Sequence, residues 1–278
     1  MTITVFSIVL LAAMCHATWN ALVKGGGDKL LTTVLITGSA AAIALVVLPF
    51  LPAPARASWP FMASSALCSI LYFTLVARIY RVADMSATYP LMRGTAPLIV
   101  ALASASVLGE PLAPLAWLGI ATICAGILNM AIGKRGGAAN AGMALALFNA
   151  LVIAIYTLID GSGVRRSGSP AAYTLWIFLL TGVPLVAWAL VAKGPAFRRY
   201  VGRNWHYGMA GGLGTVVSYG LALWAMTVAP VAMVAALRET AILFGAAISG
   251  VVLKEPLGSA RIAGACIIAA GAAALRLG

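Results

Sequence analysis

Long apolar stretches recur along the whole chain, and short polar clusters separate them. We read ten such stretches, each close to the roughly 20 residues that an α-helix needs to cross a bilayer core. They cover residues 3–23, 30–50, 59–77, 85–107, 115–133, 141–159, 171–192, 206–227, 231–253 and 261–276. Glycine, proline and charge mark their ends, as in "KGGGDK" and "LPAPARAS". Because barrel strands would alternate instead, the pattern predicts helices.

The composition places these helices in a membrane. Hydrophobic residues make up 63% of the 278 positions and charged residues only 9%, against about 25% in soluble domains. Such a chain cannot cover a water-facing surface, so we predict an all-α integral membrane protein with ten transmembrane helices. The first stretch lacks a basic leader and carries His16, Trp19 and Asn20, which indicates an uncleaved helix rather than a signal peptide.

The distribution of charge indicates which partners to expect, and the cysteines indicate whether to expect a disulfide or a metal site. The net charge of +12 is scattered over the loops between spans, where lysine and arginine meet lipid headgroups. We therefore predict the lipid bilayer as a partner and no nucleic acid. The four cysteines lie inside predicted spans without a CxxC pair or a Cys/His cluster, so the sequence predicts no disulfide, no metal site and no cofactor.

The second half of the chain repeats the first. Aligning Arg93–Leu128 with Arg238–Ala273 gives fifteen identities in thirty-six positions without a gap. Each half, residues 1–137 and 138–278, contains five predicted spans. Since an odd number of spans makes the second copy enter the membrane from the opposite side, we predict a 5+5 inverted-topology repeat around a central cavity.

Two repeat-related features have a structural interpretation. Glu110–Pro111 and Glu255–Pro256 read as helix-start motifs, with proline at the first helical position and the carboxylate at the positive end of the dipole. A gating or ligand role is the alternative. The fifth and tenth spans carry glycines seven residues apart, which favours close packing and could also allow contact with a second copy of the chain.

Polar and aromatic side chains inside the spans are the candidate cavity residues, because ionisable groups are costly in lipid. The predicted set is His16, Trp19, Asn20, Tyr72, Tyr89, Arg93, Tyr156, Tyr219, Arg238 and Glu239. Arginine keeps its proton, so Arg93 and Arg238 either satisfy backbone carbonyls or bind a substrate carboxylate or phosphate. Glu239 could pair with Arg93, titrate as a proton-coupling group, or bind a substrate ammonium. We place Asp160 at a helix end.

Ten spans, the repeat, Trp19–Asn20 followed by Lys24, and the Leu-Gly-Glu type motif at Glu110 and Glu255 together resemble the EamA family of the drug/metabolite transporter superfamily. Tyr156–Thr157 departs from a repeated Trp-Asn. The resemblance implies a secondary transporter of the cytoplasmic (inner or plasma) membrane that moves a small-molecule substrate by alternating access. It also implies export of amino acids, for which the arginines and aromatic side chains would suit aromatic or other neutral ones.

Two other functions remain open from the residues. A passive channel or facilitator is one, and a membrane-embedded transferase acting on a lipid phosphate is the other, although the chain lacks the DxxD or HxxH sets that such an enzyme uses. We expect no enzymatic activity. The even span count predicts both termini on one side. Twelve loop charges against four favour termini outside by the positive-inside rule, whereas the resemblance implies cytoplasmic termini.

Overall fold

The computed structural model describes residues 1–25, 27–83, 85–132, 140–252 and 258–278, and this part of the chain is helical without any strand. Eight of the helices described there are long and apolar enough to cross a membrane, so the chain is a multi-pass membrane protein. The elements are α1 (Ile3–Gly25), α2 (Lys29–Val47), η1 (Leu48–Phe50), η2 (Arg56–Ser58), α3 (Trp59–Val82), α4 (Met85–Val107), α5 (Pro114–Ile132), α6 (Asn140–Ser167), α7 (Pro170–Val228), α8 (Val231–Arg238), α9 (Ala241–Ala247), η3 (Ile248–Val252) and α10 (Ser259–Leu277).

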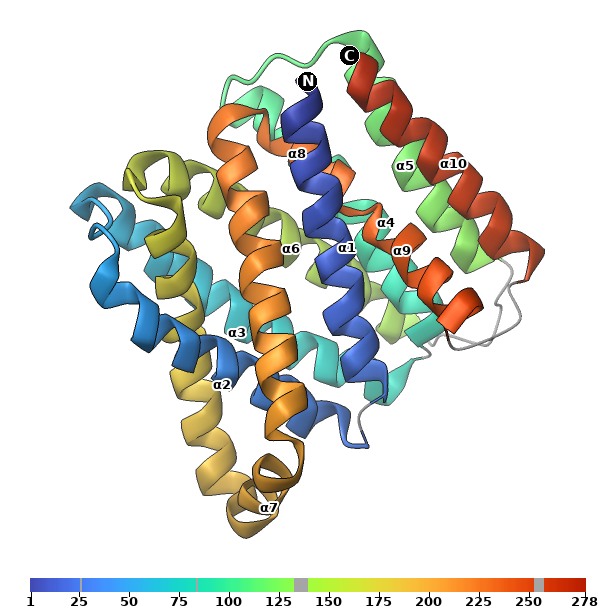
Figure 1. Cartoon of the computed structure of the whole chain (residues 1–278). Coiled ribbons are helices and arrows are strands. Elements are labelled where there is room, and N and C mark those ends of the chain that lie inside the picture. The colour runs from blue at the N-terminus through green and yellow to red at the C-terminus, as the bar shows by residue number, and fades with distance from the viewer. Residues whose placement is uncertain (26, 84, 133–139, 253–257) are drawn as a thin grey trace.

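The count of eight differs from the ten predicted spans for two reasons. The stretches 171–192 and 206–227 are the two legs of α7, which meet at a kink and are counted together as one element. Only Gly194, at φ 43° and ψ −117°, leaves the helical conformation there, and glycine adopts a positive φ without a Cβ penalty. Figure 1 shows α7 folding back into two legs that run in opposite directions. The apolar part of α5, Pro114–Met130, is shorter than the other spans.

The helices form one bundle with two paired edges (Figure 1). At one edge α5 packs along α10, and at the other α2 packs against α7. Between these edges α3 and α4 contact α6, and α1 contacts α7 and α9. Both ends of the chain lie at the same end of the bundle, where the Arg276 guanidinium donates a hydrogen bond to the Met1 carbonyl at 2.8 Å.

Glycines let the backbones of α5 and α10 approach closely. A Cβ added at Gly119 would lie 2.9 Å from the Gly271 carbonyl oxygen, and one at Gly264 would lie 2.8 Å from the Gly126 carbonyl oxygen. The glycine faces of both helices are therefore used within the chain. A homo-oligomer through these two spans stays a prediction and would have to use their outer faces.

We expect Gly119→Ala to destabilise the bundle by about 1–3 kcal/mol, the usual cost of overpacking a close contact. The new methyl would meet the Leu275 side chain and the Gly271 backbone, and the backbone cannot rotate away. The measurement is the thermal unfolding midpoint of the purified protein in detergent. Gly202→Ala is the matched control, because that α7 position has nothing within 4 Å and the added methyl favours the helix. Equal midpoints for the two variants would contradict the expectation.

Candidate functional site

A buried ion pair joins α4 to Glu239, which lies between α8 and α9. The Arg93 guanidinium, from α4, donates through Nε to Glu239 Oε2 at 2.9 Å, and the two side chains are 10% and 7% exposed. Of the three alternatives for Glu239, the structure shows pairing with Arg93. An arginine and a carboxylate removed from water need one another, since either left alone would be a buried unpaired charge.

Glu239 stands in a break between two short helices. The predicted continuous span 231–253 is interrupted, because α8 ends at Arg238 and α9 starts at Ala241. The Glu239 and Thr240 N–H groups bond to the carbonyls of Ala236 and Leu237, which tightens the last turn to the 3₁₀ type. Because of this break, the consecutive residues Arg238 and Glu239 have different partners: Glu239 pairs with Arg93, and Arg238 lies on the Tyr219 ring.

Arg238 has a different environment from Arg93. Its guanidinium carbon lies 5.1 Å from the centroid of the Tyr219 ring, a cation–π contact, and the residue is half-buried. No carboxylate of the described residues lies within ion-pair distance of it. The repeat explains the difference: the position that corresponds to Glu239 is Gly94, whose Cβ would lie 2.9 Å from the Leu128 side chain. The first half therefore offers Arg238 no acidic partner there.

Asp160 is a functional candidate that the sequence prediction assigned wrongly to a helix end. α6 continues to Ser167, so Asp160 lies within the helix and is fully buried. Its carboxylate accepts hydrogen bonds from the hydroxyls of Tyr173, at 3.1 Å, and Tyr219. The missing side chain of Gly163 makes room, because a Cβ there would overlap the Tyr173 hydroxyl. Tyr219 thus connects Asp160 to Arg238.

Aromatic side chains from α3, α4 and α6 surround the Arg93 side of this region. The rings of Tyr72 and Tyr156 meet edge to face with centroids 6.2 Å apart. Tyr89 and Tyr156 both lie within the electrostatic range of Arg93 and Glu239. The structure therefore brings these three predicted tyrosines together around the ion pair.

Residues of α1 also lie near this region. His16 lies within the electrostatic range of both Arg93 and Arg238, and its ring meets that of Trp19 at 5.2 Å. The Trp19 ring nitrogen is buried without a hydrogen-bond partner among the described residues. Asn20 differs from these two, since its amide donates to the His16 carbonyl of its own helix at 2.8 Å.

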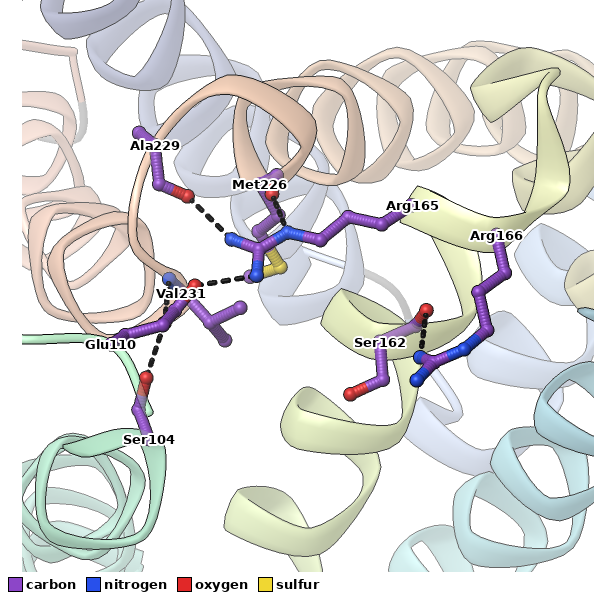
Figure 2. Close-up of polar contacts among 8 residues, drawn as sticks. All are labelled: Ser104, Glu110, Ser162, Arg165, Arg166, Met226, Ala229 and Val231. Atoms are coloured by element: carbon purple, nitrogen blue, oxygen red, sulfur yellow. Dashed lines mark hydrogen bonds and ion pairs between the residues drawn. The ribbon is translucent and has the colours of Figure 1, made fainter. Parts of the chain in front are cut away.

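A second polar cluster joins the ends of α4, α6 and α7 to the start of α8 (Figure 2). Glu110 forms an ion pair with Arg165 and accepts hydrogen bonds from the Ser104 hydroxyl and, at 2.9 Å, from the Val231 N–H. Arg165 donates to the Met226 and Ala229 carbonyls at 2.7 and 2.9 Å. The carboxylate thus caps the start of α8, while the guanidinium caps the end of α7.

This geometry corrects the helix-start interpretation of the first motif. Glu110 and Pro111 precede α5, which begins at Pro114, and the helix that Glu110 caps is α8. The reason is Gly109, whose φ of 65° ends α4 with a turn in which the Glu110 N–H bonds to the Ser104 carbonyl. The related residues Glu255 and Pro256 lie outside the described residues. Nowhere in the described ranges do three His, Cys, Asp or Glu side chains gather as metal ligands would.

Comparison with known proteins places half of the chain in a family. Residues 140–277 match the EamA-like transporter family, a segment that runs from the start of α6 into the end of α10. Among 28 matching chains of solved structures, one described as the crystal structure of a protein has a TM-score of 0.78 and 19% identity. The match covers 100% of this chain and 98% of that one, which shows the fold alone. No curated protein matches the chain in sequence.

Proposed function

Because residues 140–277 belong to the EamA-like transporter family, we propose that the chain is a secondary transporter for a neutral or aromatic amino acid. In this proposal residues 1–137 and 138–278 are inverted repeats, and the substrate binds between them by alternating access in the cytoplasmic membrane. Export is the direction that the family resemblance implies. The family match coincides with the second of the two repeats.

The glycine contacts support the inverted arrangement. The gap-free alignment makes Gly119 equivalent to Gly264 and Gly126 equivalent to Gly271. Gly119 lies against Gly271, and Gly126 lies against Gly264, so exchanging the two repeats converts each contact into the other. Residue numbers rise along one helix as they fall along the other, hence α5 and α10 are antiparallel. A two-fold axis that relates antiparallel transmembrane helices runs in the membrane plane, as an inverted repeat requires.

The helix pairs support it as well. In the proposed repeat each span corresponds to the one five spans later, so α1 corresponds to α6, α3 to the second leg of α7, and α4 to α8–α9. The contact of α1 with the second leg of α7 then corresponds to the contact of α6 with α3, and the contact of α1 with α9 corresponds to that of α6 with α4. All four pairs occur. The α5–α10 and α4–α8 pairs convert into themselves.

The environment of the interior side chains supports a water-accessible site. His16, Tyr89 and Tyr156 lie near the buried Arg93–Glu239 pair, and each is partly exposed. Partial exposure beside buried charges is what we expect of side chains that line a substrate site. We therefore place the substrate between α1, α4, α6 and the α8–α9 break.

Arg238 is the group that we expect to bind the substrate, and its lack of an acidic partner is the observation that carries the proposal. A guanidinium in the bundle interior keeps its charge and favours a carboxylate in bidentate geometry. Arg93 is already neutralised by Glu239. Glu239 bonds to Arg93 through Oε2, so its second oxygen, Oε1, would accept the substrate ammonium, and the tyrosines would contact the substrate side chain.

The test is counterflow of labelled amino acids in proteoliposomes. Wild type should exchange a neutral amino acid such as phenylalanine but not phenethylamine, the analogue that lacks the carboxylate. We expect Arg238→Gln to raise the half-saturating concentration roughly tenfold to hundredfold, the equivalent of losing about 1.5–3 kcal/mol from a charged hydrogen bond. Saturation and counterflow also separate a carrier from a passive channel.

Arg198→Gln is the matched control, because it removes an exposed arginine near the turn between the two legs of α7. Equal exchange of phenylalanine and phenethylamine would remove the carboxylate-binding role from Arg238. Failure of every amino acid to exchange in wild type would remove the substrate class altogether.

A further inference from the structure

Asp160 is an intramembrane carboxylate whose role the proposed amino-acid site does not explain. It is 0% exposed, lies within α6, and has no cation of the described residues within ion-pair distance. An ionised carboxylate in such a place costs free energy unless it is paired or takes up a proton. Its hydrogen bonds come from neutral groups, the phenol hydroxyls of Tyr173 and Tyr219.

The surroundings of Asp160 can accommodate both of its charge states. When the carboxylate is ionised, the two phenols donate to its two oxygens. When it is protonated, its new O–H needs an acceptor, and Ser65 of α3 provides one. That serine is fully buried and its hydroxyl lies beside Asp160. Because a hydroxyl can both donate and accept, it can donate to the ionised carboxylate and accept from the protonated one.

The charged and titratable groups that face Asp160 come from each neighbouring helix. Besides the two phenols from α7, they are Tyr156 of α6, Cys68 of α3 and Arg238 at the end of α8. Arg93 of α4 acts on Tyr156 and is neutralised by Glu239. The positive charge that acts on Asp160 is therefore that of Arg238, which lies on the ring of the same Tyr219 that bonds to Asp160.

We propose that Asp160 is the proton-binding site of the transporter and that Tyr219 couples it to the substrate site at Arg238. The coupling rests on the proposed function, whereas proton binding by Asp160 does not. A substrate carboxylate on Arg238 neutralises the charge that stabilises ionised Asp160. Asp160 then binds a proton more readily, and by linkage a proton on Asp160 strengthens substrate binding. Proton and substrate therefore move together, in the same direction.

This sign of coupling has a consequence for direction. With cotransport, an inwardly directed proton gradient drives amino-acid uptake, so the export implied by family resemblance would need an outwardly directed substrate gradient large enough to oppose it. An exchanger in which proton and substrate compete would show the opposite dependence. The two mechanisms are thus distinguishable by the sign of the pH effect on affinity.

Proton binding is tested by infrared difference spectroscopy of the purified protein over a pH series. Wild type should show a protonated-carboxyl band that disappears as the pH rises, and Asp160→Asn should lack it, whereas Glu239→Gln should keep it. Tyr219→Phe removes one hydrogen bond to the ionised form and keeps the ring beneath Arg238, so the titration should move to higher pH. Saturating phenylalanine should raise the proton affinity about fivefold or more.

Coupling is tested in proteoliposomes with an imposed pH gradient and a panel of amino acids that includes phenylalanine. Wild type should accumulate its substrate when the lumen is alkaline. Asp160→Asn should abolish accumulation and retain counterflow, because the substrate site remains and Asn fills the same space. Thermal unfolding of the variant verifies that it is folded, and Tyr173→Phe, which keeps the ring, gives a milder second variant.

Several outcomes would overturn the inference. An unchanged infrared band in Asp160→Asn would exclude this residue as the proton site whatever the substrate is. Accumulation by Asp160→Asn equal to wild type, or accumulation driven by a sodium gradient instead of a pH gradient, would exclude the coupling while leaving the carrier intact. If wild type exchanges no amino acid, the proposed function fails and takes the coupling with it, and the infrared titration still decides whether Asp160 binds a proton.

Discussion

Replacing Arg93 with methionine should destabilise the folded protein by about 3–5 kcal/mol, the usual cost of removing one partner from a buried ion pair. Glu239 would keep its place in the α8–α9 break, where it is buried, and would lose the cation that neutralises it. The penalty comes from this uncompensated charge rather than from a lost attraction. Reversible unfolding of the purified protein in detergent measures it.

The double variant Arg93→Met with Glu239→Gln separates this explanation from simple loss of packing. It removes both charges, so its stability should recover most of what each single variant loses. Arg199→Met, an exposed position on α7, is the control and should change little. Additive losses in the double variant would show that the pair is not energetically coupled. Transport should stay low in the double variant, since Glu239 is also the proposed partner of the substrate ammonium.

The sequence predicts the helices well wherever apolar length decides their positions. Most predicted spans coincide with described helices to within a few residues, because a run of apolar residues bounded by glycine, proline or charge reports on the bilayer thickness. It predicts less where the backbone continues through polar sequence. The residues after 159 are polar and glycine-rich, yet α6 extends to Ser167, because Asp160 and Arg165 find partners on α7 and at Glu110.

The candidate site shows the same division. The charges of Arg93, Arg238 and Glu239 inside apolar stretches are enough to select these residues as candidates, because an ionisable group within a membrane span costs free energy. Which of the two arginines takes the glutamate depends on contacts between segments more than a hundred residues apart, and no local pattern contains that information. Gly94 is the one sequence signal of the asymmetry, because it stands where the second half has Glu239.

Exchange of the Val231 amide hydrogen should accelerate roughly tenfold to hundredfold in Glu110→Ala, because its acceptor is lost and a hydrogen bond to a charged group contributes about 1.5–3 kcal/mol. The same change leaves Arg165 without its carboxylate, so the α7–α8 turn loses support from both directions (Figure 2). Hydrogen–deuterium exchange of peptides from this turn, followed by mass spectrometry, measures the effect.

The neighbouring arginine provides the control for this cluster. Arg165→Gln should accelerate exchange in the α7–α8 turn, since the Met226 and Ala229 carbonyls lose their donor. Arg166→Gln should leave it unchanged, because Arg166 bonds to the Ser162 carbonyl of its own helix and lies over the Phe61 ring. Equal effects of the two substitutions would mean that the turn responds to charge in general. A specific effect of Arg165 would instead tie the position of α8, and with it that of Arg238 and Glu239, to an ion pair at the far end of that helix.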